Sequence, residues 1–177
     1  MSFGPKLPSA SAVVLLIAGL VLLFLTKGEG EDRGRERRGE PVGKSVDAAV
    51  VRVVDGDTAQ MELDSGGEEG VRFIGVDTPE SVAPGQPVEC FGKKASRFTS
   101  GLLEGERVTL RFGEERRDFY DRLLAYVYVE DRFVNAEFVR LGFARTLEIA
   151  PNVDYAEKFG RLQQEAANAG LGLWGAC

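Results

Sequence analysis

The pattern of hydrophobic and polar positions divides the chain into three parts, the first of which is a continuous apolar run. Residues 10–25 read ASAVVLLIAGLVLLFL, with one serine as the only polar side chain. The length of this run lies between that of the apolar core of a signal peptide and that of a membrane-spanning helix. A buried core helix is disfavoured because the run has no polar face to meet water. We therefore interpret residues 1–28 as a signal peptide or signal anchor, which contacts the membrane through residues 10–25 if it is not cleaved.

The second part is a highly charged stretch with very few apolar side chains. Residues 29–46 contain only two valines among many acidic and basic groups. Such a composition cannot bury enough apolar surface to fold, so we predict a disordered charged linker. Its arginines favour a cytoplasmic location by the positive-inside rule, so charge alone leaves the membrane orientation open.

The third part, residues 47–177, alternates between strand-like and helix-like patterns. Strands are expected at residues 49–54, 59–63, 71–76, 107–112 and 123–129. Helices are expected at residues 91–102, 135–141 and 153–166, where apolar side chains recur on one face or a glycine closes the segment. The segment is too short for a doubly wound parallel sheet. We therefore predict a β-rich α+β fold, a small β-barrel with packed helices.

Composition and charge narrow the chemistry that this chain can perform. With 22 basic and 28 acidic side chains the net charge is −6, which argues against tight non-specific binding to duplex nucleic acid. There is no histidine, which excludes a Ser-His-Asp triad, a histidine-ligated zinc site and a histidine general base. Two cysteines cannot form a four-cysteine metal site. A catalytic metal in this chain must therefore be bound by oxygen atoms.

Two short segments place carboxylates at the ends of predicted strands. Asp57 lies in the sequence DGDT, which alone is a common hairpin turn. Asp77 and Glu80 follow the third predicted strand, and Pro79 favours an extended Thr78 whose carbonyl would point beside Asp77. Two carboxylates and a carbonyl form a hard oxygen donor set, which suits Ca²⁺ better than Zn²⁺.

A third charged segment, residues 116–122, has the sequence RRDFYDR and precedes the last predicted strand. Taken alone, such a segment is typical of a solvated hairpin loop. We keep that interpretation for Arg116 and Arg117.

Seven stretches, in the same order and spacing, resemble the thermonuclease (staphylococcal nuclease) family. They are VVDGDT (53–58), VRFIGVDTPES (71–81), ECFGKKAS (89–96), DFYDRLLAYVYV (118–129), VNAEFVRLGFA (134–144), PN (151–152) and GLGLW (170–174). For residues 47–177 the resemblance implies a five-stranded OB-type β-barrel with three helices. It also implies a monomeric Ca²⁺-dependent phosphodiesterase that cleaves DNA and RNA, preferentially single or breathing strands, to 3′-phosphate products.

The resemblance assigns a metal site and a group that activates water. Asp57, Asp77 and the backbone carbonyl of Thr78 would hold Ca²⁺. Glu80 would act as the general base or position the water, and it can do so at an ordinary carboxylate pKa because the metal acidifies that water.

The resemblance also assigns the contacts to the phosphate. Arg72 and Arg122 would clamp the phosphate through forked hydrogen bonds that lysine cannot reproduce, and Tyr120 would contact it as well. With no histidine in the chain, Arg122 or a water molecule would have to assist the leaving 5′-oxygen.

Several positions depart from the family pattern. Phe119 stands where the family often has lysine, Asp121 where it has glycine, and Leu147 and Ile149 where its best-known member has an aromatic pair. These departures leave substrate preference open. They also keep an alternative function, a catalytically inactive OB-type module that binds nucleic acid or protein. The presence of all five charged site residues favours the enzyme.

The two cysteines allow two interpretations. Cys90 and Cys177 are either free thiols or one disulfide, which would form if the C-terminal segment packs against the helix predicted from residue 91. A disulfide would indicate an oxidising compartment. Together with the apolar leader, this predicts an extracytoplasmic protein, either secreted or anchored to the membrane by its N-terminal segment.

Overall fold

The computed structural model describes residues 45–82, 85 and 87–177. The expected signal segment and the expected linker up to residue 44 lie outside the described residues. The first strand, β1 (Ser45–Asp55), begins two residues before the expected start of the folded region.

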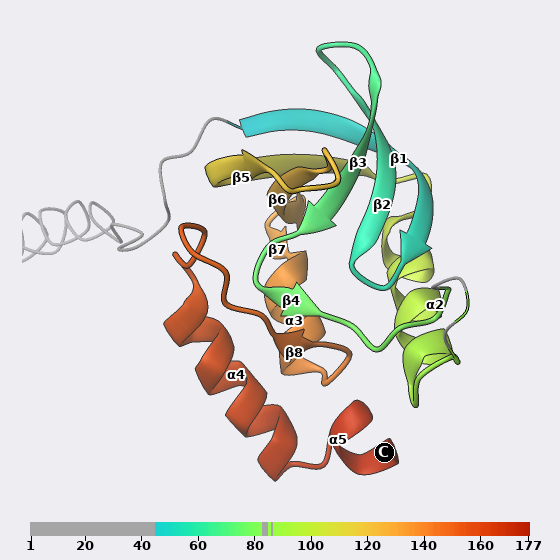
Figure 1. The fold of residues 1–177 in the computed structure, drawn as a ribbon, viewed down its shortest axis with the longest axis vertical. Helices are drawn as coiled ribbons and strands as arrows, with labels where there is room; N and C mark the ends of the chain where they lie inside the picture. Colours follow the sequence, from blue (N-terminus) through green and yellow to red (C-terminus); the bar gives the residue numbers. More distant parts are fainter. Residues whose placement is uncertain (1–44, 83–84, 86) are drawn as a thin grey trace, which may run out of the picture. The chain divides into compact units, whose positions relative to one another are not determined.

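The centre of the folded unit is a closed five-stranded barrel (Figure 1). Besides β1 it contains β2 (Thr58–Leu63), β3 (Glu68–Phe73), β5 (Arg107–Arg117) and β6 (Leu123–Val129). Neighbouring strands pair antiparallel in the order β3-β2-β1-β5-β6, and a parallel pairing of β3 with β6 closes the barrel. Apolar side chains at alternate positions of these strands fill the interior. The prediction of a five-stranded OB-type barrel is therefore confirmed.

Three helices pack around this barrel, as predicted. They are α2 (Gly92–Leu103), α3 (Val134–Arg140) and α4 (Ala156–Asn168). In Figure 1, α2 lies beside β1, whereas α3 lies between the barrel and α4. Short elements complete the fold: β4 (Val76–Asp77), β7 (Arg132–Phe133), β8 (Arg145–Thr146) and α5 (Leu173–Ala176). Among the described residues, no helix combines the length and apolar character needed to cross a membrane.

One predicted strand, residues 71–76, is interrupted. β3 ends at Phe73, and Gly75 turns the chain with a φ of 78° before β4 pairs with β8. A Cβ atom at Gly75 would lie 2.4 Å from the Phe159 ring, so this turn requires glycine for both its conformation and its packing. The apolar pattern conceals the turn because Ile74 and Val76 are both buried. The turn carries Asp77 out of the barrel sheet toward the β1–β2 turn.

A buried asparagine fixes the end of β3. The Asn135 side chain is fully buried at the start of α3; its Oδ1 accepts a hydrogen bond from the Val127 N–H, and its Nδ2 donates to the Ile74 carbonyl, each at 2.8 Å. Buried polar groups need such partners. Asn135 therefore ties α3 to β6 and to the turn that leads to Asp77.

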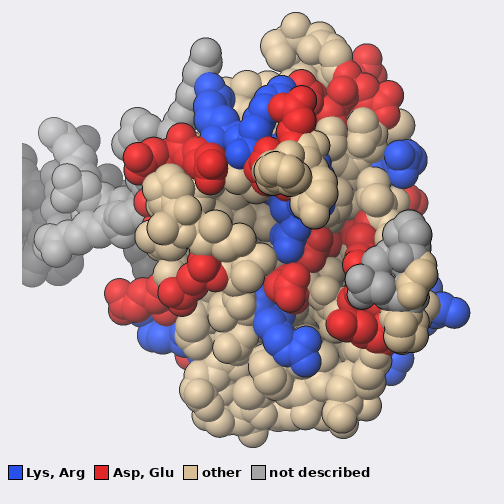
Figure 2. All heavy atoms as spheres, viewed as in Figure 1, with Lys and Arg blue, Asp and Glu red and all other residues tan. Residues whose placement is uncertain are grey.

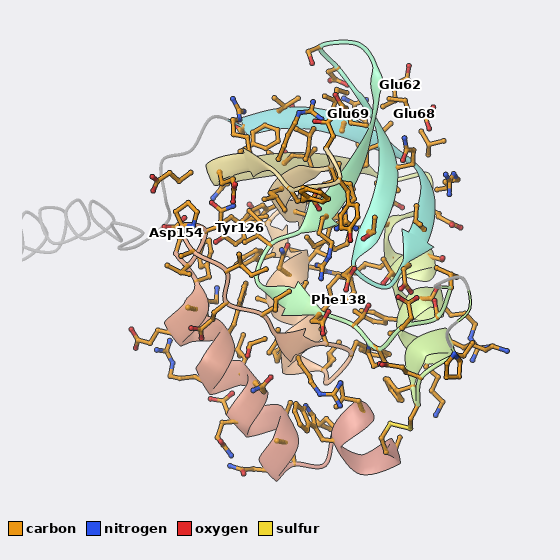
Figure 3. All side chains as sticks on the ribbon, in the orientation of Figure 1. Glu62, Glu68, Glu69, Tyr126, Phe138 and Asp154 are labelled. Carbon is orange, nitrogen blue, oxygen red and sulfur yellow. A yellow bond between two sulfur atoms is a disulfide. The ribbon has the colours of Figure 1, made fainter. Side chains whose placement is uncertain are left out.

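A disulfide joins the beginning of α2 to the C-terminus. Cys90 and Cys177 are bonded across a sequence separation of 87, with their Cα atoms 5.9 Å apart (Figure 3). Cys177 directly follows α5, so the C-terminal turn is held against α2.

Candidate active site

The β1–β2 turn buries the carboxylate of Asp57. Its Oδ2 accepts hydrogen bonds from the Thr78 N–H at 2.9 Å and the Thr78 hydroxyl at 3.0 Å, while Oδ1 accepts one from the Thr58 hydroxyl at 3.1 Å. The neighbouring Gly56 permits this approach, because a Cβ there would lie 2.5 Å from Thr78 Oγ1. The DGDT segment is therefore a turn that receives the Asp77–Thr78 strand end.

Arg72, on β3, connects the two carboxylates expected to bind metal. Its Nη1 donates to the carbonyls of Phe73 at 2.8 Å and Val76 at 2.7 Å. Its Nε lies 3.3 Å from Oδ1 of Asp57, and its Nη2 lies 3.5 Å from Oδ1 of Asp77. One guanidinium group therefore lies against both carboxylates while being fixed by backbone acceptors.

Negative charge is concentrated at this point. Burial and the charge of Asp57 together raise the pKa of Asp77, although Arg72 partly offsets them. A cation held between the two carboxylates would relieve this repulsion. Within the described part of the chain, no three acidic or cysteine side chains gather in a way that could hold a metal. A metal here would thus take two carboxylates and the Thr78 carbonyl from the protein and its remaining oxygens from water or substrate, a donor set that fits Ca²⁺.

Glu80 lies against another carboxylate, that of Asp55 at the end of β1. Burial raises the pKa of Asp55, and the side chain of Glu80 raises it further, whereas hydrogen bonds from the Ser81 hydroxyl and the Gly56 N–H oppose the shift. Glu80 Oε1 itself accepts a hydrogen bond from the Val82 N–H at 2.7 Å. The Glu80 carboxylate is therefore held beside the same turn that presents Asp57.

The backbone of Glu80 is fixed by the segment that leads into α2. The Glu89 carboxylate accepts a hydrogen bond from the Glu80 N–H at 3.2 Å, and the Glu89 N–H donates to the Glu80 carbonyl at 2.9 Å. At Gly92, a Cβ would lie 2.3 Å from that same carbonyl, so α2 packs directly on it. Cys90 places the disulfide next to Glu89.

Arg122 is positioned by the loop between β5 and β6. Its Nε and Nη2 donate to Oδ2 of Asp118 at 2.7 and 2.6 Å, and its Nη1 lies 3.4 Å from Oγ1 of Thr58. Oδ1 of Asp118 also accepts the N–H groups of Tyr120 and Arg122. Burial would raise the pKa of Asp118, but these hydrogen bonds and the Arg122 charge lower it overall.

Both arginines border one cavity of about 360 Å³. Its lining residues are Arg72, Phe73, Ile74, Gly75, Glu115, Asp118, Phe119, Arg122, Leu124, Leu147, Ile149 and Asn152. The candidate metal-binding and water-activating residues do not line it, but Arg72, which does, also contacts Asp57 and Asp77. Tyr120 is exposed, with its ring 5.3 Å from the Arg122 guanidinium.

Asp121, which replaces the glycine of the family pattern, is contacted by Arg117. Asp121 adopts a left-handed φ of 63°, and Arg117 donates to its carbonyl at 2.6 Å. Arg117 also forms a forked pair with Glu69 at 2.8 and 3.0 Å, which lowers the pKa of Glu69. Arg116 lies over the Phe112 ring at 4.3 Å. From the sequence we interpreted both arginines as solvated charges of a hairpin loop. The structure instead gives each of them a specific contact.

Some residues of this site do not stand out in the sequence. Asn152 is one: its side chain accepts from the Glu115 N–H and donates to the Glu115 carbonyl, which shapes the cavity wall. Asp55, Glu89 and Asp118 position Glu80 and Arg122 in the same way. All four residues lie inside the stretches that resemble the family, but the groups to which they hydrogen-bond are visible only in the fold.

The sequence of this chain is similar to those of known nucleases. Residues 70–176 match the family model described as staphylococcal nuclease homologue. The chain is 38% identical to the thermonuclease of Staphylococcus intermedius over 164 residues, covering 93% of this chain and 96% of the relative. It is 33% identical to the thermonuclease of Staphylococcus hyicus, with the same coverage of both chains. It is also 36% identical to endonuclease YncB of Bacillus subtilis over 133 residues, covering 74% of this chain and 63% of that protein. The chain therefore belongs to the staphylococcal nuclease family.

Proposed function

We propose that this protein is a Ca²⁺-dependent nuclease that hydrolyses phosphodiester bonds of DNA and RNA in single or breathing strands. The observation that carries the proposal is the position of Arg72, which contacts both Asp57 and Asp77 and also borders the cavity shared with Arg122. A phosphate bound by the two guanidinium groups would lie next to the two carboxylates. The thermonuclease and endonuclease relatives support this chemistry.

The residues that would hold Ca²⁺ are Asp57, Asp77 and Thr78, the last through its carbonyl. Bound there, the ion would neutralise phosphate charge and acidify a water molecule. The protein contributes by burying Asp57 and by fixing Thr78 against it. Arg72, held by the Phe73 and Val76 carbonyls, would orient both carboxylates.

The remaining side chains would act either on the attacking water or on the phosphate and its leaving oxygen. Glu80 accepts a proton from the water whose oxygen attacks phosphorus, which is a general-base step. Arg72 and Arg122 donate hydrogen bonds to the phosphate oxygens as their negative charge increases. When the bond from phosphorus to the 5′-oxygen breaks, that oxygen is hydrogen-bonded by Arg122 and takes a proton from solvent. The phosphate therefore remains on the 3′-oxygen.

We further propose that the enzyme acts outside the cytoplasm, as a monomer. The Cys90–Cys177 disulfide supports an oxidising compartment, where such bonds persist. If the leader is not cleaved, residues 10–25 would keep the enzyme at the membrane surface.

The proposal is tested by digesting heat-denatured DNA with the full-length protein in Ca²⁺, comparing wild type with Glu80→Gln. We expect the variant to lose roughly 10²- to 10⁴-fold in kcat, the usual contribution of a general base. Glu62→Gln is the matched control, because Glu62 lies on the β2–β3 hairpin, away from β4 (Figure 3).

Two results would contradict the proposal. A wild-type rate for Glu80→Gln would remove Glu80 from catalysis. A folded wild-type protein that binds single strands but cuts none under any divalent ion would instead indicate the inactive binding module.

A further inference from the structure

The loop between β5 and β6 presents an aromatic side chain almost entirely to solvent. Phe119 is 97% exposed, and the adjacent Tyr120 is 75% exposed. Their rings lie 5.6 Å apart and nearly perpendicular. A phenylalanine this exposed does not contribute to the hydrophobic core, so core packing does not explain its position.

The loop is held by contacts that do not involve the Phe119 side chain. Asp118 accepts two backbone N–H groups and the Arg122 side chain, and Arg117 donates to the Asp121 carbonyl. These bonds fix the backbone on both sides of Phe119. The backbone that carries the ring is therefore held in place, which lowers the entropy lost when a ligand packs on the ring.

The place is the rim of the cavity that Arg72 and Arg122 also border. These cations suit a phosphate, while the apolar part of the lining suits a flat apolar group attached to it. Leu124, Leu147 and Ile149 supply aliphatic contacts but no aromatic face. Phe119 is thus the side chain at the rim of this cavity that can offer an exposed ring to a nucleobase.

We propose that Phe119 is the stacking platform for the nucleobase next to the scissile phosphate, and that it makes the enzyme select nucleotides whose base is unpaired and unstacked. The inference rests on the proposed nuclease function and identifies its substrate class more closely. Every base has a π-face, so Phe119 would select for a base that is present and unstacked, whichever of the bases it is. In a duplex both faces of each base are already stacked, and Phe119 would have no face to contact.

The test uses a short thymidine oligonucleotide in which methylphosphonates replace all linkages except one. Two further versions carry an abasic nucleotide on the 5′ or the 3′ side of that linkage. We expect kcat/KM of the wild-type, full-length protein to be roughly 5- to 150-fold lower for one of the abasic versions, the range that base–aromatic stacking supplies.

Substitutions then assign this preference to the ring. Phe119→Ala and Phe119→Leu should both reduce cleavage of the complete oligonucleotide to about the abasic level and leave the abasic rate unchanged. Phe119→Trp should keep the preference, because it restores a π-face that leucine lacks. Val51→Ala is the control, since Val51 is also an exposed apolar side chain but does not line the cavity.

Binding of the same oligonucleotides in EGTA, followed by fluorescence anisotropy, separates this inference from the nuclease proposal. Phe119-dependent binding without cleavage in Ca²⁺ would support stacking and contradict the nuclease. Cleavage that Phe119→Ala lowers equally for complete and abasic strands, or does not lower at all, would overturn the stacking role alone. A folded protein that neither binds nor cleaves would overturn both.

Discussion

Arg72 shows how much of the site depends on the geometry of a single side chain. Its guanidinium contacts two backbone carbonyls and two carboxylates from three different segments of the chain. A lysine could satisfy one or two of these acceptors but not all four, because it presents its donors from a single point. Arg122 likewise reaches acceptors in two segments, Oδ2 of Asp118 through Nε and Nη2 and the Thr58 hydroxyl through Nη1.

Asp118 leads to a prediction about stability and pH. Its pKa is lowered in the folded protein, so its stabilising effect is present above the unfolded value near 3.8 and is lost as the pH falls through the lower folded value. Asp118→Asn should reduce the free energy of unfolding by about 1–3 kcal/mol at pH 7, the usual range for hydrogen bonds to a charged group. The difference from wild type should shrink below pH 4.

Urea unfolding at pH 7, 4 and 3 measures this effect. Asp131→Asn, in the turn between β6 and β7, serves as the control and should change little. A difference between Asp118→Asn and wild type that stays constant from pH 7 to pH 3 would show that the Asp118 charge does not act as described.

At the scale of elements, the regular strands and helices could be predicted but the interruptions could not. The barrel strands and the three helices follow from their apolar periodicity. The turn at Gly75 could not be predicted, because Ile74 and Val76 keep the strand-like pattern while the chain changes direction. Its cause is the Phe159 ring, which approaches from α4, more than 80 residues later in the sequence.

The connection of α2 to the C-terminus predicts an effect on both stability and catalysis. The disulfide closes a loop with a sequence separation of 87, and its removal in a Cys90→Ser/Cys177→Ser variant should cost about 4–5 kcal/mol in the chain-entropy model. Because Glu89 fixes the Glu80 backbone, we also expect kcat to fall while KM changes little. Thermal unfolding and steady-state cleavage measure the two effects.

Dithiothreitol provides the control for that prediction. It should lower the stability of the wild type to that of the double variant and leave the variant itself unaffected. A double variant as stable as the wild type would mean that the C-terminal segment does not depend on the disulfide.

At the scale of the whole molecule, the net charge is negative although basic side chains gather locally on one face. Residues 47–177 carry 15 basic and 23 acidic side chains, a net charge of −8. Figure 2 nevertheless shows several groups of Lys and Arg side chains down the middle of one face, with Asp and Glu between and beside them. Net charge from the sequence argues against a broad nucleic-acid-binding face but cannot reveal local groups of basic side chains, which depend on the fold. An acidic protein of this kind can approach a phosphate where arginines and a bound cation offset its charge.

The central claim is that Asp57 and Asp77 hold the Ca²⁺ on which cleavage depends, and a titration tests it most directly. Initial rates of single-strand cleavage by the full-length protein would be measured as Ca²⁺ is raised from an EGTA-buffered zero, for wild type and Asp77→Asn. We predict no cleavage in EGTA, saturation with Ca²⁺ in the wild type, and a midpoint at least about tenfold higher in the variant, because one of two ligand charges is lost. Undiminished cleavage in EGTA, or the same midpoint in both proteins, would contradict the claim.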